Sequence, residues 1–209
     1  FTFRSSLSAT IIYNWKITNA DSSIPEMQRR MAEFAAVRPY FYEDPIPDNM
    51  AAMTKLTEEI DLPVATGERF INLMEFDEFM TASHVRYVRP DMCVAGGITA
   101  GKKIAALAEA KSIYIIPHNP LGPISTAACL QLDACIPNFE IQEYPVDDEG
   151  HCRLDKEMKQ PFAIKNGYIQ IPDGPGLGIE LLDDIGTVFP FKGRYGKFVQ
   201  HEDGSIVDR

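Results

Sequence analysis

Residues 40–45 read YFYEDP, an aromatic run that stops at two acids and a proline, Glu43, Asp44 and Pro45. Aromatic side chains favour strands, and a proline ends strand pairing because it has no N–H to donate. Acidic residues are rarely buried without a partner, so a buried strand that ends on carboxylates needs an explanation. The explanation depends on whether other strands of the chain end in the same way.

Four more strand-like segments end on an ionisable residue. Together with Glu43, these residues are Glu68, Asp91, His118 and Glu143, spaced about 25 residues apart. Apolar residues at helical spacing fill the intervals and predict helices over 48–60, 72–83, 96–111 and 122–134. Short strands that alternate with helices of this length predict βα units and a parallel sheet.

The repeated strand ending narrows the fold class. An open, doubly wound α/β sheet has a similar rhythm of strands and helices. A TIM-type (β/α)8 barrel in addition needs functional side chains at the carboxyl end of successive strands, because its active site lies there. We therefore predict an α/β chain with about six of the eight barrel strands, the first within residues 8–15. Residues 1–185 would form this partial barrel domain and 186–209 a C-terminal tail.

Composition limits the classes of partner. The chain has 209 residues, 45% of them hydrophobic, and a formal net charge of -10. This acidic balance argues against a nucleic-acid or anionic membrane surface, which needs clustered Lys and Arg. No apolar stretch reaches the roughly 18 residues of a membrane span. The four cysteines show no CxxC spacing, so we expect reduced thiols in a cytoplasmic protein.

The five strand-end residues suit one kind of chemistry. Each alone has an ordinary explanation, such as a solvated turn, a surface ion pair or a helix cap, but their joint pattern favours a site. Glu43 and Glu68 are hard oxygen ligands of the kind that Mg²⁺ prefers. His118 would act as a base, and Asp91 would fix its tautomer. Glu143 would donate a hydrogen bond or proton to an enediolate formed next to a substrate carboxylate.

Six motifs support a family resemblance. They are FYEDP, PVATGERF, VRPDMCVAGGIT, IIPHNPLGPISTAACLQLD, NFEIQEY and GPGLGIELLDD, spread over roughly residues 38–185. They resemble the mandelate racemase group of the enolase superfamily, and within it the acid-sugar dehydratases of galactonate and mannonate type. The resemblance implies that Glu43 and Glu68 bind Mg²⁺ and that Asp91 and His118 form a catalytic dyad, with Glu143 nearby. It also implies a small sugar-acid substrate that is dehydrated to a 2-keto-3-deoxy acid.

The chain departs from this family pattern in two places. The family's first metal ligand is the Asp of a D-x-N motif, and here Ile17 takes that position, with Asn19 in the Asn position. Asn19 or Asp21 would be a weak substitute ligand. No capping domain or earlier lysine-bearing strands precede Phe1, so we expect a fragment whose open sheet edges favour a homo-oligomer.

Two alternatives to a dehydratase stay open. A racemase or epimerase of the same group would need a second base on the opposite face of the substrate. A catalytically silent remnant would keep the fold without the chemistry, and the missing ligand, capping domain and lysines are the reasons to consider it.

Overall fold

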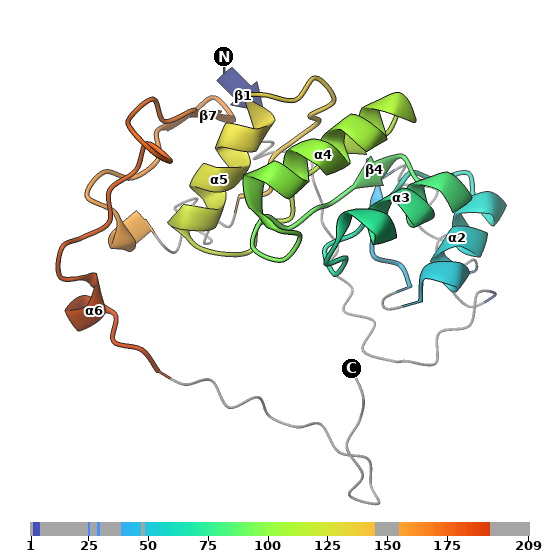
Figure 1. Cartoon of the computed structure of the whole chain (residues 1–209), viewed down its shortest axis with the longest axis horizontal. Coiled ribbons are helices and arrows are strands. Elements are labelled where there is room, and N and C mark those ends of the chain that lie inside the picture. Colours follow the sequence, from blue (N-terminus) through green and yellow to red (C-terminus); the bar gives the residue numbers. More distant parts are fainter. Residues whose placement is uncertain are drawn as a thin grey trace, which may run out of the picture.

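The computed structural model describes residues 2–4, 25, 29, 39–46, 49–144 and 155–192 (Figure 1). The strand predicted within residues 8–15 lies outside these ranges, and so do Ile17, Asn19 and Asp21.

A parallel sheet runs through the middle of the chain. Its strands are β2 (Tyr42–Glu43), β3 (Val64–Thr66), β4 (Tyr87–Val88) and β5 (Tyr114–Ile115). They pair in chain order, β2-β3-β4-β5, and every pair is parallel. A parallel bridge from Ile115 to Phe139 adds the next segment. This uninterrupted order is that of a TIM-type barrel, whereas a doubly wound sheet reverses its order at a switch point.

Four helices alternate with these strands and agree with the predicted ranges. They are α2 (Met50–Glu59), α3 (Leu73–Ala82), α4 (Gly97–Ala110) and α5 (Pro123–Asp133). They lie in a row along one side of the molecule, each packed against the next (Figure 1). The side chains of Asn49 and Asn72 accept hydrogen bonds from backbone N–H groups at the starts of α2 and α3, which fixes both N-termini.

The main hydrophobic core fills the space between the sheet and the helices. It includes Leu56, Phe76, Phe79, Ile104 and Leu132, all fully buried. A smaller cluster on the other face of the sheet consists of Phe41, Ala65, Tyr87 and Ile116, packed with Ile141. In a complete barrel this second face would be the interior. Within the described residues the sheet does not close into a barrel.

A second, antiparallel sheet was not predicted. Strand β7 (Tyr168–Gln170) pairs with β6 (Ile164–Lys165) on one side and with β1 (Thr2–Arg4) on the other. Asn166 and Gly167 join β6 to β7 with positive φ angles of 52° and 77°, as in a two-residue hairpin turn.

The remaining short elements lie in the C-terminal part of the chain. A 3₁₀ helix, η1 (Asp155–Glu157), precedes β6, and helix α6 (Ile185–Val188) follows β7. Helix α6 crosses the predicted boundary between the barrel at 1–185 and the tail at 186–209. The boundary itself stays a prediction.

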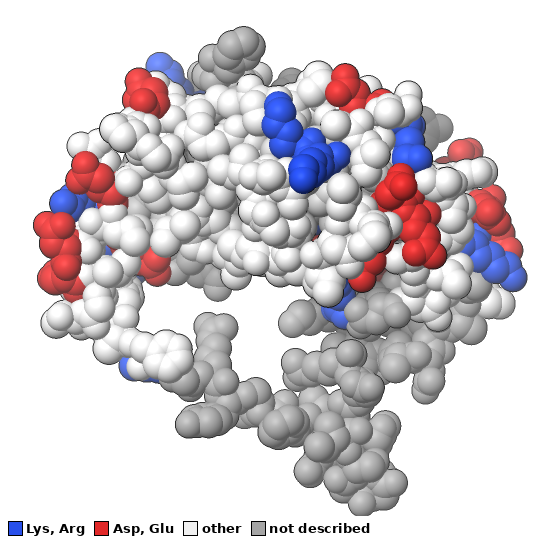
Figure 2. Space-filling model, viewed as in Figure 1, with Lys and Arg blue, Asp and Glu red and all other residues white. Residues whose placement is uncertain are grey.

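The charged side chains are dispersed on the helix-covered face. Figure 2 shows acidic residues toward both ends of this face, with a small basic group between them and wide uncharged areas. No helix in the described part of the chain has the length and apolarity that a membrane crossing requires.

Candidate active site

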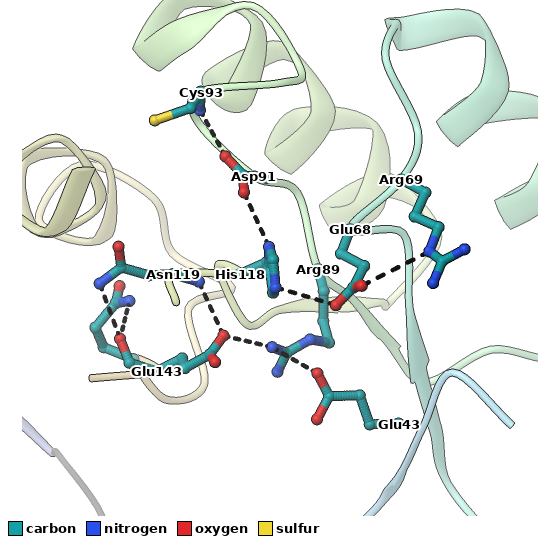
Figure 3. A network of polar contacts seen from close by, with 10 residues as sticks. Glu43, Glu68, Arg69, Arg89, Asp91, Cys93, His118, Asn119 and Glu143 are labelled. Atoms are coloured by element: carbon teal, nitrogen blue, oxygen red, sulfur yellow. Dashed lines mark hydrogen bonds and ion pairs between the residues drawn. The ribbon is translucent and has the colours of Figure 1, made fainter. Parts of the chain in front are cut away.

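The five predicted residues come together at the carboxyl edge of the parallel sheet (Figure 3). Glu43 is the last residue of β2, and Glu68 lies two residues after the end of β3. Asp91 and His118 face each other through a parallel bridge just beyond β4 and β5. Glu143 follows the segment that Phe139 joins to the sheet. The sheet thus brings together five residues from distant parts of the sequence, and their roles in a site stay a prediction.

Asp91 and His118 form a closely held pair. His118 Nδ1 lies 2.9 Å from Asp91 Oδ2, and the other oxygen, Oδ1, accepts a hydrogen bond of 2.7 Å from the Cys93 N–H. Burial alone would raise the pKa of Asp91, which is only 3% exposed, but these hydrogen bonds outweigh burial and lower the pKa. Asp91 is therefore a fixed carboxylate that accepts the Nδ1 proton of the imidazole.

The other ring nitrogen of His118 faces a second acid. Nε2 lies 3.0 Å from Glu68 Oε2. Burial alone would lower the pKa of His118, but the Asp91 hydrogen bond and the charges of Glu143 and Glu68 outweigh it and raise the pKa. The imidazole therefore holds its proton more firmly than a free histidine does.

A sharp turn brings Glu68 to this position. The turn depends on Gly67, whose φ of +123° lies in a region that other residues rarely adopt. A Cβ on this residue would lie 2.8 Å from the ring of Phe76 and 3.4 Å from the backbone nitrogen of Arg89. The glycine thus allows the chain to leave β3 close beside β4 and to direct Glu68 at His118.

Arg89 is a member of the site that the sequence analysis missed. Its Nη2 lies 2.8 Å from Glu43 Oε1 and 2.6 Å from Glu143 Oε2, and the side chain is 1% exposed. Arg89 directly follows β4, and it lies two residues before Asp91. An arginine directly after the strand-like pair Tyr87–Val88, and shortly before Asp91, was the available signal.

Asn119 is a second residue that the analysis did not single out. Its backbone N–H donates to Glu143 Oε2 at 2.8 Å, and its buried side-chain amide donates to Thr126 Oγ1 at 2.8 Å. Glu143 Oε2 therefore accepts from both Arg89 and Asn119. The side chain of Glu143 is held on one oxygen, and no hydrogen bond to the other, Oε1, is found among the described residues.

The acids at the end of β2 are crowded. Burial raises the pKa of Glu43 to about 6, with Arg89 lowering it and the charges of Glu143, Asp44 and Glu68 raising it. Burial also raises the pKa of Asp44, whose carboxylate accepts a hydrogen bond from the Thr66 hydroxyl. This part of the site has more negative than positive charge, which is the electrostatic setting of a cation site.

The donors agree with Mg²⁺ in kind, although they are not gathered around one point. Glu43 and Glu68 supply carboxylate oxygens from neighbouring strands, as a hard divalent ion requires. In the structure Glu43 faces Arg89, and Glu68 faces His118. Across the described ranges, no group of three or more His, Cys, Asp or Glu side chains is arranged to hold a metal ion.

A parallel sheet in chain order, with a histidine–aspartate pair and three glutamates at its carboxyl edge, is the arrangement of a domain of the TIM-barrel class. The chain belongs to the enolase C-terminal domain-like family, whose sequence model matches residues 18–185. The resemblance found in the motifs is thereby confirmed.

Two relatives with an assigned activity carry the same name. The chain is 38% identical over 164 residues to a D-galactonate dehydratase of Ralstonia pickettii (strain 12J), covering 76% of this chain and 43% of the relative. It is 34% identical over 194 residues to a D-galactonate dehydratase of Cronobacter sakazakii (strain ATCC BAA-894), covering 89% and 50%. The chain thus spans about half of the length of these relatives or less.

Solved structures agree on the fold. An enolase from Agrobacterium radiobacter, crystallised with Na and L-malate, matches with a TM-score of 0.77 and 29% identity, covering 88% of this chain and 50% of the other. A mandelate racemase/muconate lactonizing enzyme from Jannaschia sp. CCS1 matches with a TM-score of 0.74 and 31% identity, covering 83% and 44%.

Proposed function

We propose that the chain carries the catalytic face of an acid-sugar dehydratase of galactonate or mannonate type. The enzyme would remove the proton next to the substrate carboxylate and expel the β-hydroxyl, giving a 2-keto-3-deoxy acid. The observation that carries the proposal is the histidine held on both ring nitrogens, with Asp91 on one side and Glu68 on the other. The relatives named D-galactonate dehydratase support the same reaction.

His118 is the proposed base. Since Nδ1–H is donated to Asp91, the proton is accepted at Nε2, on the side of Glu68. Removal of the α-proton breaks the C–H bond, and its electron pair moves onto the substrate carboxylate to give an enediolate. The electron pair then returns to form a C=C bond as the C–O bond to the β-hydroxyl breaks. The imidazolium then gives its proton to the departing oxygen, which leaves as water, and the enol tautomerises to the 2-keto acid. A raised His118 pKa suits the second half of this step, because the proton stays on the ring until the hydroxyl leaves.

Glu143 is the proposed partner of the substrate oxygen on which negative charge develops. Arg89 and the Asn119 N–H both donate to Oε2. A proton on this acid would therefore be carried by Oε1, from which it can form a hydrogen bond to an enediolate.

Mg²⁺ is the proposed cofactor, held by Glu43 and Glu68, with Asn19 as a weak further candidate outside the described residues. When bound, the ion would neutralise the substrate carboxylate and so acidify the neighbouring C–H bond. The excess of acidic side chains around Glu43 supports a cation at this position. A sugar acid as partner, a homo-oligomeric assembly and a cytoplasmic location belong to the same proposal.

The test is product formation by the full 209-residue chain from D-galactonate and from D-mannonate in the presence of Mg²⁺. We expect a 2-keto-3-deoxy acid, detected by NMR, and none from the His118→Asn variant, which keeps a similar volume but cannot act as the base. Exchange of the α-proton for deuterium without dehydration would instead favour the racemase or epimerase. Absence of both reactions would mean that this chain is a silent remnant.

A further inference from the structure

We infer that Arg89 is a positioning residue for this reaction, because it fixes Glu43 and Glu143 on opposite sides of one guanidinium group. The inference rests on the proposed function and adds a residue to it. Arg89 lies on the segment between β4 and Asp91, in the middle of the sheet. Glu43 comes from β2 and Glu143 from the segment beyond β5, so one side chain connects the two sides of the site (Figure 3).

The geometry makes the two contacts depend on each other. The same nitrogen, Nη2, lies 2.8 Å from Glu43 Oε1 and 2.6 Å from Glu143 Oε2. Movement of Nη2 toward one carboxylate would lengthen the contact to the other. The contact to Glu143 is a charge-assisted hydrogen bond, which is among the stronger polar contacts in proteins, and the contact to Glu43 is a close ion pair. Together they favour the present positions of both carboxylates.

Arg89 is more deeply buried than the two acids that it contacts, and this difference indicates a different role. Its side chain is 1% exposed, whereas those of Glu43 and Glu143 are 16% and 22% exposed. The cation thus lies beneath the carboxylates and cannot reach a substrate directly. Each acid uses one oxygen to hold Arg89, and its other oxygen is the one available to a substrate or a cation.

The arginine carries a cost that a purely structural residue would avoid. Its Nε has no hydrogen-bond partner within the described part of the chain, although it is buried. An unsatisfied buried donor destabilises a protein, and an apolar residue of similar size would remove that cost. Holding Nη2 between two carboxylates accounts for an arginine at this position.

The test compares Arg89→Met and Arg89→Lys with Arg86→Lys. Arg86 is a matched control, because it is an exposed arginine near the start of the same strand, above the ring of Tyr87. We expect Arg89→Met to lower kcat by about 10- to 100-fold with a smaller change in KM, the usual loss when a group that supports a site ligand is removed. Arg89→Lys should recover part of the rate, and Arg86→Lys should have the wild-type rate.

A second experiment tests whether Arg89→Met lowers kcat through its contact with Glu143. In a Glu143→Gln background, Arg89→Met should cost markedly less than it does in the wild type, because part of what it positions is already lost. Equal costs in both backgrounds would contradict the inference. So would an Arg89→Met enzyme that unfolds more readily in urea but turns over at the wild-type rate per folded molecule.

A crystal structure of Arg89→Met separates this inference from the proposed function. We expect the carboxylates of Glu43 and Glu143 to turn away from their present positions, whether or not the chain is active. Unmoved carboxylates would overturn the positioning role. A wild-type chain without turnover, combined with displaced carboxylates in the variant, would refute the dehydratase and leave the role of Arg89 standing.

Discussion

Asp133 offers a direct measurement of what a buried, unpaired acid costs this fold. It is the last residue of α5 and is 1% exposed, and neither of its carboxyl oxygens has a hydrogen-bond partner in the described structure. Burial raises its pKa well above the ordinary value. In the folded chain Asp133 is therefore a neutral acid well above the pH at which an exposed aspartate ionises.

The sign of the pH dependence follows from this raised pKa. In the unfolded chain Asp133 ionises at its ordinary pKa of about 3.9, while in the folded chain it keeps its proton to a higher pH. Below pH 3.9 or so, both states are protonated and Asp133 causes no loss of stability. As pH rises from there toward the folded pKa, the unfolded state is favoured by about 1.4 kcal/mol per pH unit.

Asp133→Asn removes this titration and keeps nearly the same volume. The free energy of unfolding, measured in urea at pH 4, 5, 6 and 7, should fall relative to the variant as pH rises, by about 1.4 kcal/mol per unit until the pH reaches the folded pKa. The exposed Asp61, changed to Asn, is the matched control and should follow the wild type. Parallel curves for wild type and Asp133→Asn would refute the reasoning, because Asp133 would then ionise equally in both states.

Three further substitutions test other features. Gly67→Ala should destabilise the chain by roughly 1–3 kcal/mol in urea unfolding, because its φ of +123° and the 2.8 Å approach to Phe76 leave no room for a methyl group. Asn138→Ala should cost about 1–3 kcal/mol by thermal unfolding, because its amide donates to two backbone carbonyls at 3.0 and 2.9 Å. Asn72→Ala should cost about 1 kcal/mol, measured by the same method, through loss of the α3 cap; an unchanged Tm would contradict the capping role.

The site could be predicted from the sequence because it depends on one residue at the end of each strand. The strands are short and evenly spaced, so Glu43, Glu68 and His118 were visible as interruptions of apolar runs. Arg89 was missed because it is buried beneath the acids and its partners are about 50 residues away in each direction along the sequence. Its position in the strand-like segment that leads to Asp91 was the local signal.

Of the other features, one was visible in the local sequence and two were not. The hairpin at 164–170 was recognisable from Asn166–Gly167 between two strand-like pairs, and was overlooked. The pairing of β1 with β7 joins segments at opposite ends of the sequence, and no periodicity predicts such a partner. Asp133 lies in an apolar helix, and only the packing around it shows that its carboxyl group is without a partner.

The chain order of the parallel sheet has a consequence for folding kinetics. Each strand pairs with the strand of the next βα unit, so the pairings close loops of similar length and none has a much larger entropic cost than the others. The site draws one side chain from each of these units, from Glu43 to Glu143, and an intermediate that lacks any unit has an incomplete site. A ligand of the site would therefore slow unfolding and leave the early steps of refolding unchanged.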